Sequence, residues 1–509
     1  MRCVFRFWFA FALGLALMSG CSDENGEGGS GGTGGMPECQ SPEDCNDAND
    51  CTADACADGV CEFTAVEDQT DCTVLGELFS APGLCVTGSC VLECEVLGEG
   101  SACRLPTEGT GVCIDIFCEP RCENDTDCTD YKDCTADTCL SNGLCESIAV
   151  QNGTPCEGGT CQSGECNLET SLLPCNEQGI RNATAAGGGP YMFDCGGPKT
   201  VAIQTTIAID KNVSLDGAGD LTIKGNDDES VVSVARGVTA ELDGLVVTGG
   251  FSPASGSIEN LGTLTLTNCS VSENAGTGID NEGTLTLMNS TVSDNGRSFP
   301  QYAIGVGGID SHGDRASLTL MNSAVLDNAG YVGGISAGGV LSAVNTTISG
   351  NSGDRVGGIR VSGTVTLVSS TVSGNETGER SDIFGLDTAG DSLTVANTII
   401  DGDCSTFRSI VSLGYNIESP DQTCGFDQTS DQPGVTAEQL NLGPLADNGG
   451  PTMTHALQTV PVVSVAIDHI PAGDCVDADG QPLTTDQRGE PRPETGGTLC
   501  DVGAFEVQP

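Results

Sequence analysis

The chain has 509 residues, with 72 Asp and Glu against 18 Lys and Arg, which gives a formal net charge of −54. Nucleic acids and anionic lipid surfaces are themselves anionic, so this charge argues against both as main partners. Aromatic residues make up only 4% of the chain, and its single Trp, Trp8, lies near the N-terminus.

The N-terminal segment reads MRCVFRFWFAFALGLALMSGCS. Two arginines precede an apolar run that is too short to span a bilayer, as in a signal peptide over residues 1–20. The run ends at LMSGC, which resembles the lipobox of bacterial lipoproteins. The resemblance implies a lipid on Cys21, and Ser22 in place of Asp implies sorting to the outer membrane. An ordinary secretory leader with Cys21 as a stray thiol is the alternative.

Residues 21–37 are rich in Gly and partly acidic, which predicts a flexible tether between the lipid and the rest of the chain. We therefore expect the protein to lie at the cell surface, held to the outer membrane by its N-terminal lipid. No later segment of the sequence is long and apolar enough to span a membrane.

Residues 38–168 hold 20 of the 29 Cys, in two sets of eight separated by a set of four. Even sets in short modules predict disulfides within each module, because so few apolar residues cannot form a stabilising core. Such disulfides require an oxidising compartment. The recurring C-T-x-D-x-C phrase resembles Cys-rich repeats of secreted and surface proteins, which implies a stalk or a recognition region.

A metal site in this region is the weaker interpretation. Zinc is disfavoured because the region has no His. The acidic phrases, such as EDCNDANDC, lack the Gly and the final Glu of a calcium loop, so we expect solvated turns. We therefore expect no cofactor, with Ca²⁺ as the remaining alternative.

After a cap at residues 169–200, residues 201–428 repeat one phrase, which first reads GTLTLTNCSVSEN. Apolar and small polar residues alternate with period two, which predicts strands, and a recurrence every 20 to 30 residues predicts a solenoid. Asn residues mark the repeats at spacings of 21, 33, 23 and 24: Asn274, Asn295, Asn328, Asn351 and Asn375. The pattern resembles the right-handed parallel β-helix, so we expect an all-β fold.

Stacked coils place equivalent residues above one another at about 4.8 Å. Leu264, Leu285 and Leu318 are then expected to form an inward column. A second set of equivalent residues, Asn268, Asn289, Asn322 and Asn345, is expected to form an amide ladder. Cys269 occupies a column of Ser and Thr, so we expect a buried free thiol.

Six other cysteines suggest three disulfides: Cys175 with Cys195, Cys404 with Cys424, and Cys475 with Cys500. Residues 429–509 contain the phrases NLGPLADNGGPTMTHALQTVPVVSVAID, TDQRGEPRP and CDVGAFE, which resemble the terminal block of bacterial β-helix proteins of the choice-of-anchor Q type. Members commonly carry a sorting tail beyond this block, a role that we expect the lipid at Cys21 to replace. His455, Asp486 and Arg488 are expected to make capping contacts that close the last coil, with catalysis as the alternative.

Aligning the Gly-Gly-Ile turns places Glu259, Asp280, Asp310, Ser336 and Arg360 in one outward column, with Arg315, His312 and Arg355 on nearby turns. Asp280 and Asp310 are the sharpest candidates for a cation site or an acid/base pair. A strongly acidic chain also brings two carboxylates together by chance, so solvated side chains are the favoured interpretation.

We therefore expect a non-enzymatic surface protein that binds or scaffolds at the cell exterior, for example in adhesion to a polysaccharide or another surface ligand. A surface-tethered polysaccharide lyase or glycosidase acting through Asp280 and Asp310 is the alternative, and a purely structural coat is a third hypothesis.

Overall fold

The computed structural model describes residues 122–509 with short gaps, and before them the backbone of eight strands between residues 52 and 120. The gaps are residues 123, 131, 141–142, 169–170, 253–254, 297–304, 314, 378–381, 386–390, 406–409 and 478. The expected signal peptide, the lipidation site Cys21 and the tether all lie outside the described residues. The chain divides into two compact units, residues 1–121 and 122–509, and each is described by itself.

The described strands of the first unit form three small antiparallel sheets. Each has a tight pairing that sets two cysteines opposite one another: Cys56 and Cys61, Cys85 and Cys90, and Cys113 and Cys118. The strands are β1 (Thr52–Ala57), β2 (Val60–Ala65), β3 (Asp71–Leu75), β4 (Ser80–Val86), β5 (Ser89–Leu92), β6 (Ala102–Arg104), β7 (Thr110–Ile114) and β8 (Phe117–Pro120).

The second unit begins with the second set of eight cysteines. All eight form disulfides, and none joins cross-strand neighbours: Cys122–Cys139, Cys128–Cys145, Cys134–Cys161 and Cys156–Cys166. These sulfurs are therefore used in cross-links and offer no thiolates for zinc. The elements are η2 (Asp125–Cys128), β9 (Thr135–Cys139), β10 (Cys145–Ala149), β11 (Pro155–Cys156), β12 (Gly159–Gln162) and β13 (Glu165–Leu168).

This module packs directly on the N-terminal cap of the solenoid. The cap helix α2 (Glu177–Ala186) begins at Asn176, whose side chain also donates to Glu157 Oε1 at 3.1 Å. Asn182 Nδ2 donates to the Glu157 carbonyl at 3.1 Å, and Lys211 forms an ion pair with Glu165 at 2.7 Å. The boundary between the compact units thus falls at residues 121/122, inside the Cys-rich region expected at 38–168.

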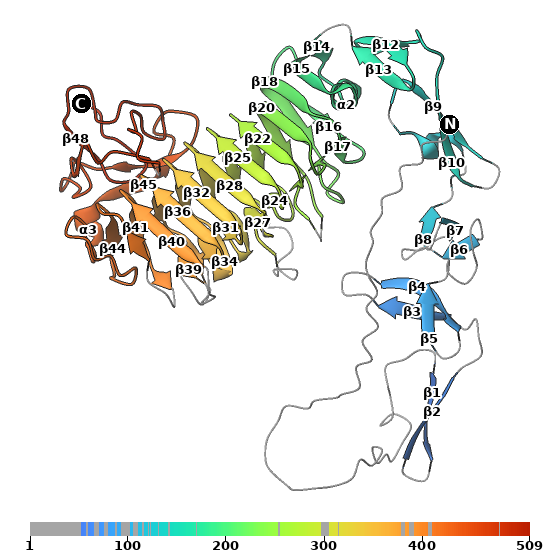
Figure 1. The fold of residues 1–509 in the computed structure, drawn as a ribbon, viewed down its shortest axis with the longest axis horizontal. Coiled ribbons are helices and arrows are strands. Elements are labelled where there is room, and N and C mark those ends of the chain that lie inside the picture. Colours follow the sequence, from blue (N-terminus) through green and yellow to red (C-terminus); the bar gives the residue numbers. More distant parts are fainter. Residues whose placement is uncertain are drawn as a thin grey trace. The chain divides into compact units, whose positions relative to one another are not determined.

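Residues from β17 (Ile207–Ile209) to β44 (Ile417–Ser419) form a right-handed parallel β-helix, so the predicted fold class is confirmed (Figure 1). Each regular coil contributes one strand to each of three parallel sheets. Sheet 1 contains β22 (Thr263–Thr267), β25 (Thr284–Met288), β28 (Ser317–Met321), β32 (Val340–Val344), β36 (Thr364–Val368), β40 (Ser392–Ala396) and β43 (Val411–Ser412).

Sheet 2 contains β23 (Ser270–Ser272), β26 (Thr291–Ser293), β29 (Ala324–Leu326), β33 (Thr347–Ser349), β37 (Thr371–Ser373), β41 (Ile399–Asp401) and β44. It joins sheet 1 through the long strands β18 (Val213–Lys224) and β20 (Thr239–Thr248), which extend to the cap strands β14 (Leu172–Pro174), β15 (Gly188–Asp194) and β16 (Lys199–Ala202).

Sheet 3 has nine strands: β17, β19 (Val232–Val234), β21 (Ile258–Asn260), β24 (Ile279–Asn281), β27 (Ile309–Ser311), β31 (Ile335–Ala337), β35 (Ile359–Val361), β39 (Ile383–Gly385) and β42 (Cys404–Ser405). A small parallel sheet of β30 (Ala329–Val332), β34 (Ser352–Val356) and β38 (Glu376–Thr377) lies between sheets 2 and 3 in the chain.

The core consists of stacked aliphatic columns. Leu264, Leu285 and Leu318 pair in register in sheet 1 and are each 0% exposed, so the predicted inward column is confirmed. Burial of a leucine side chain stabilises by about 1.5–3 kcal/mol. Cys269 is buried and free, as its column of Ser and Thr predicted.

The amide ladder differs from the predicted one. The expected residues are in the left-handed conformation at the corner between sheets 1 and 2. Among the described contacts they make only two long side-chain bonds to one another, Asn289 to Asn268 at 3.4 Å and Asn345 to Asn322 at 3.3 Å. The continuous ladder is formed instead by the five Asn that mark the repeats, each bonding the next at 2.8–3.0 Å: Asn274, Asn295, Asn328, Asn351 and Asn375. It ends on Asp382.

The C-terminal block, residues 429–509, extends further than the expected closure of the last coil (Figure 1). It runs back over sheet 2, where Thr347 donates to Gln487 Oε1 at 2.7 Å and Ala504 N donates to Thr371 Oγ1 at 3.1 Å. Its elements are α3 (Ala437–Leu440), β45 (Leu442–Ala446), β46 (Thr454–Leu457), β47 (Ile470–Pro471) and β48 (Leu499–Cys500). The expected capping contacts therefore involve earlier coils as well as the last one.

Candidate functional site

The outward column on sheet 3 has the register that the sequence alignment predicted. Glu259 pairs with Asp280, Asp280 with Asp310, Asp310 with Ser336, and Ser336 with Arg360. Neighbouring strands lie about 4.8 Å apart, so Asp280 and Asp310 are adjacent while Arg360 is about 10 Å beyond Asp310. The column thus runs from three acids through Ser336 to a single base across five coils.

Asp280 has a specific partner in the next coil. The His312 Nε2 atom lies 2.9 Å from Asp280 Oδ1, and the Asp280 side chain is 14% exposed. The contact with the Asp280 carboxylate raises the pKa of His312 to about 9, although partial burial acts in the opposite direction. His312 is therefore an imidazolium at neutral pH, and it neutralises the carboxylate beside it.

The other two acids of the column hold protons more tightly than usual. Burial is the main reason that the pKa of Asp310 is raised, and the charge of Asp280 adds to it, whereas His312 lowers it. The pKa of Glu259 is raised by burial and then by Asp280 and Glu282. A carboxyl with a raised pKa beside an ionised one is an arrangement that can act as a general acid with a second carboxylate.

The two remaining basic candidates do not complete a reactive centre around these acids. Arg355 donates to the Tyr331 hydroxyl at 2.6 Å and lies over its ring at 5.9 Å, on the small sheet. Arg315 is exposed on the turn after His312. In the described part of the chain, the only sets of three or more His, Cys, Asp or Glu ligand atoms within 4.8 Å of one another are disulfide-bonded cysteines.

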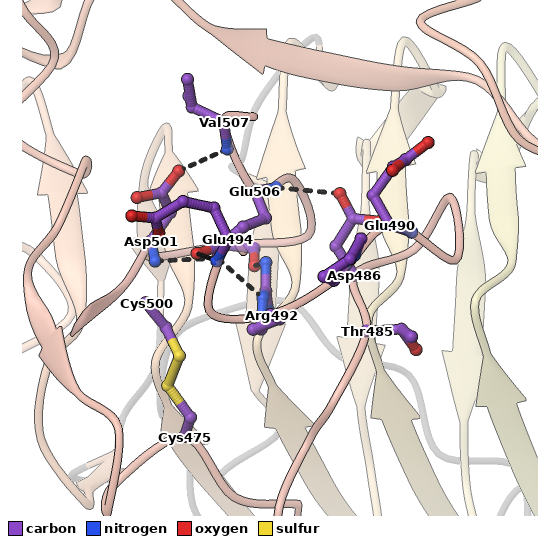
Figure 2. A network of polar contacts seen from close by, with 12 residues as sticks. Cys475, Thr485, Asp486, Glu490, Arg492, Glu494, Cys500, Asp501, Glu506 and Val507 are labelled. Atoms are coloured by element: carbon purple, nitrogen blue, oxygen red, sulfur yellow. Dashed lines mark hydrogen bonds and ion pairs between the residues drawn. A yellow bond between two sulfur atoms is a disulfide. The ribbon is translucent and has the colours of Figure 1, made fainter. Parts of the chain in front are cut away.

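A second polar centre lies in the C-terminal block, where Figure 2 shows Arg492 among several acidic side chains, with the Cys475–Cys500 disulfide beside them. Arg492 Nε lies 3.1 Å from Glu506 Oε2, and the Asp501 amide donates to the same oxygen at 2.9 Å. The Arg492 guanidinium also reaches Asn345 Oδ1 at 3.2 Å, which joins the network to the β-helix. Burial raises the pKa of Glu506 to about 7 and that of Asp501 to about 6.

The three residues proposed as capping contacts are all tied to this block. Asp486 is 0% exposed and forms an ion pair with Arg488 at 2.7 Å, and the Arg488 guanidinium stacks on Phe505 at 3.6 Å. His455 Nε2 lies 2.8 Å from Ser349 Oγ, and burial lowers the pKa of His455. His455 thus contacts the β-helix, whereas the contacts of Asp486 and Arg488 lie within the block. Arg492, Asp501 and Glu506 were not selected from the sequence, although EPRP and CDVGAFE contain them.

Disulfides join all three of the sparse cysteine pairs named from the sequence, which are Cys175–Cys195, Cys404–Cys424 and Cys475–Cys500. The first lies in the cap, the second links sheet 3 to the end of the solenoid, and the third lies within the C-terminal block. The first two therefore cross-link the two ends of the β-helix, where coils have a neighbour on one side only.

Among the described residues, no helix has the length and apolar character needed to cross a membrane. No family model matches the chain. Two proteins of Dictyostelium discoideum are similar to part of it. Protein psiR is 26% identical over 183 residues, which cover 29% of this chain and 18% of psiR, and protein psiQ is 27% identical over 147 residues, which cover 28% and 14%.

This chain thus spans less than a fifth of the length of the two curated relatives. Among solved structures, a crystal structure of the pectate lyase Pel9A matches 64% of this chain and 90% of its own, with 15% identity and a TM-score of 0.30.

Proposed function

We propose that this chain is a lipid-anchored protein of the bacterial cell surface whose β-helix is a rigid rod for binding or scaffolding at the cell exterior. Its N-terminal phrase LMSGC, its Gly-rich tether and its disulfides all suit an exported chain held by Cys21. The C-terminal block would be of the choice-of-anchor type, and it would serve as a lock on the rod. An extracellular polysaccharide or another surface ligand would be the partner.

The ion pair of Asp280 with His312 is the observation that supports a binding role over a catalytic one. The carboxylate that would have to act as a base, a nucleophile or a cation ligand already has a cation from the same chain at 2.9 Å. A rod stiffened by a buried Asn ladder and cross-linked at both ends suits a display role.

Labelling cells with a radioactive fatty acid tests the anchor. We expect the wild-type chain to carry the label and Cys21→Ala to lose it, while Cys269→Ala, which removes the buried thiol, serves as the matched control and keeps it. Protease treatment of intact cells then reports exposure at the surface. A labelled Cys21→Ala chain, or a chain protected in intact cells, would contradict the proposal.

A tethered polysaccharide lyase or glycosidase is the second candidate. The register of Asp280 with Asp310 favours it, because carboxyls about 5–5.5 Å apart act as the pair of retaining glycosidases. Purified protein is incubated with a panel of acidic polysaccharides, with and without Ca²⁺. Product that appears with the wild type and with Glu241→Ala, but not with Asp280→Ala/Asp310→Ala, would establish the enzyme and overturn the binding role.

A further inference from the structure

The outward face of sheet 1 is an ordered array of hydroxyl groups. One column of residues pairs in register across six successive strands, from β22 to β40: Thr265, Thr286, Thr319, Ser342, Thr366 and Thr394. A neighbouring column, two residues earlier in each strand, repeats Thr or Ser on five of these strands, with Val340 on the sixth. We call these two columns the hydroxyl face.

The hydroxyls of this face are open to solvent. All twelve side chains are exposed or half-buried, and none of their hydroxyls bonds to another residue in the described part of the chain. The equivalent groups of sheet 2 behave differently, since Thr347, Ser349 and Thr371 each bond to the C-terminal block. Hydroxyls on the later coils of sheet 2 therefore already serve as a binding surface, whereas those of sheet 1 do not.

The hydroxyl face carries no charge, although the chain has a net charge of −54. None of the outward positions of the six strands is Asp, Glu, Lys or Arg, including the third column, which runs from Thr267 and Met288 to Ala396. The face ends at β20, whose outward residues include Glu241 and Asp243. An uncharged surface on an anionic protein suits an uncharged partner. The protein would repel a polyanion, and a polycation would bind more tightly to the acidic parts of its surface.

The spacing of the face defines the shape of that partner. Hydroxyls repeat at about 4.8 Å along the rod and at about 6.7 Å across it, because alternate residues of a strand point the same way. Threonine side chains in strands have few rotamers, so little freedom is lost when they bind. An extended β-linked sugar chain advances by a similar distance per ring and presents hydroxyls at each ring.

We infer that the hydroxyl face binds an uncharged, extended β-linked polysaccharide, with successive sugars over successive coils. This inference rests on the proposed binding role at the cell exterior and names the ligand class for it. The face has no aromatic ring on which a sugar could stack, so each sugar gains only hydrogen bonds and methyl contacts. Binding therefore requires many coils at once, and long or insoluble polymers should bind where short oligosaccharides do not.

Co-sedimentation with cellulose, chitin and an insoluble β-1,3-glucan tests the inference, with pectate on beads as the charged comparison. The protein is the chain from residue 21 carrying Cys21→Ala, so that no lipid contributes. The triple variant Thr286→Val/Thr319→Val/Thr366→Val keeps the shape and the strand preference of the face but removes three central hydroxyls. We expect the wild type to bind at least one uncharged polymer, and the variant to need at least tenfold more protein for half-saturation.

The matched control is Ser272→Ala/Thr291→Val/Ser293→Ala, which removes three hydroxyls from the uncovered part of sheet 2 in the neighbouring coils, and it should bind like the wild type. A second test, Thr319→Asp, places one charge near the centre of the face and should abolish binding without unfolding, as circular dichroism would show. Equal binding by the wild type and the triple valine variant would overturn the inference, as would the absence of binding to all three uncharged polymers.

Two further outcomes separate the inference from the proposed function. If cells label the chain with lipid but the valine substitutions leave polymer binding unchanged, the proposed surface role is supported and the binding role of the hydroxyl face is refuted. Polymer binding that depends on the hydroxyls, in a chain that cells do not label, would support the face and refute the anchor. A dimer that the valine substitutions dissociate, without any effect on polymer binding, would identify the face as a self-interface and overturn the inference.

Discussion

The buried Asn ladder should make a large contribution to the stability of the rod, and Asn328 is the member that tests it best. Asn328 is 0% exposed and lies in the middle of the ladder. Its Oδ1 accepts from Asn295 N at 3.1 Å and from Asn295 Nδ2 at 2.8 Å. Its Nδ2 donates to the Val292 carbonyl and to Asn351 Oδ1, both at 3.0 Å.

Replacing Asn328 with Ala removes all four of these bonds. The amide hydrogen of Asn295 and one hydrogen of its side chain lose their acceptor in a site that water does not reach. Each buried donor left without a partner costs about 1–3 kcal/mol. We therefore expect Asn328→Ala to lower the free energy of unfolding by about 2–5 kcal/mol, with no contribution from backbone strain, because the left-handed residue of this turn is Asp327.

The matched control is Asn289, which recurs at the same spacing but makes one side-chain bond of 3.4 Å to Asn268 at the half-buried corner. Its φ of 51° calls for Gly as the replacement, because Gly adopts this conformation without a steric cost. Asn289→Gly should change stability by less than about 1 kcal/mol. Urea unfolding measures both variants, and hydrogen exchange should locate the loss of protection at the coils around Asn328. Equal destabilisation by the two substitutions would refute the assignment of the ladder.

Three other substitutions have defined pH signatures. Burial raises the pKa of Asp382 to about 6 from 3.8, so the contribution of Asp382 to stability is lost as pH rises through that window. Asp382→Asn should therefore be more stable than the wild type by up to about 3 kcal/mol at pH 8 and equal to it near pH 3. Urea unfolding at both pH values measures this difference. Arg492→Met should lower the free energy of unfolding by about 3–5 kcal/mol, because it leaves the buried Glu506 carboxylate without its cation. The loss should be larger at pH 8 than at pH 5, because the raised pKa of Glu506 leaves it protonated at the lower pH. A loss in thermal melting that is independent of pH would contradict this. NMR titration of His312 should give a pKa of about 9 that falls toward 6.5 in Asp280→Asn, and an unchanged midpoint would rule out the ion pair.

The strand register could be predicted from the sequence because the repeat phrase is long enough to align itself. Each coil carries the same alternation of inward Leu or Val with outward Thr or Ser, and a shift by one residue would turn every apolar side chain outward. Asp280 and Asp310 were placed on neighbouring strands for the same reason, and the structure pairs them directly.

The position of the ladder could not be predicted in this way. The two Asn columns, which begin at Asn268 and Asn274, recur at identical spacings, so periodicity gives no reason to prefer either. What separates them is the backbone at each corner. Asn268 itself is left-handed and its side chain lies at the surface, whereas at the next corner Glu273 is left-handed and the side chain of Asn274 lies inside. A spacing rule counts residues along the chain and contains no information on which residue of a turn takes the positive φ.

The contact of Asp280 with His312 could not be predicted from the sequence, for a related reason. His312 follows Asp310 by two residues, and the simplest expectation joins these two neighbours. The side chain instead contacts Asp280 on the preceding coil, at 2.9 Å. Which of two stacked acids a turn residue contacts depends on the path of that turn, and this turn occurs in a single coil.

The outward residues of sheets 1 and 2 differ along the β-helix. On sheet 2 the column that begins with Ser270 and Thr291 ends with Ile399 and Ile417, which are 0% exposed beneath the C-terminal block. Beneath the block the same column also contains Thr347 and Thr371, which are buried and bond to the block through their hydroxyls. The first two columns of sheet 1 keep hydroxyls as far as Ser392 and Thr394, with Val340 as the exception. A face that stays uncharged and, apart from Val340, polar over six coils is suited to a partner that binds through hydrogen bonds.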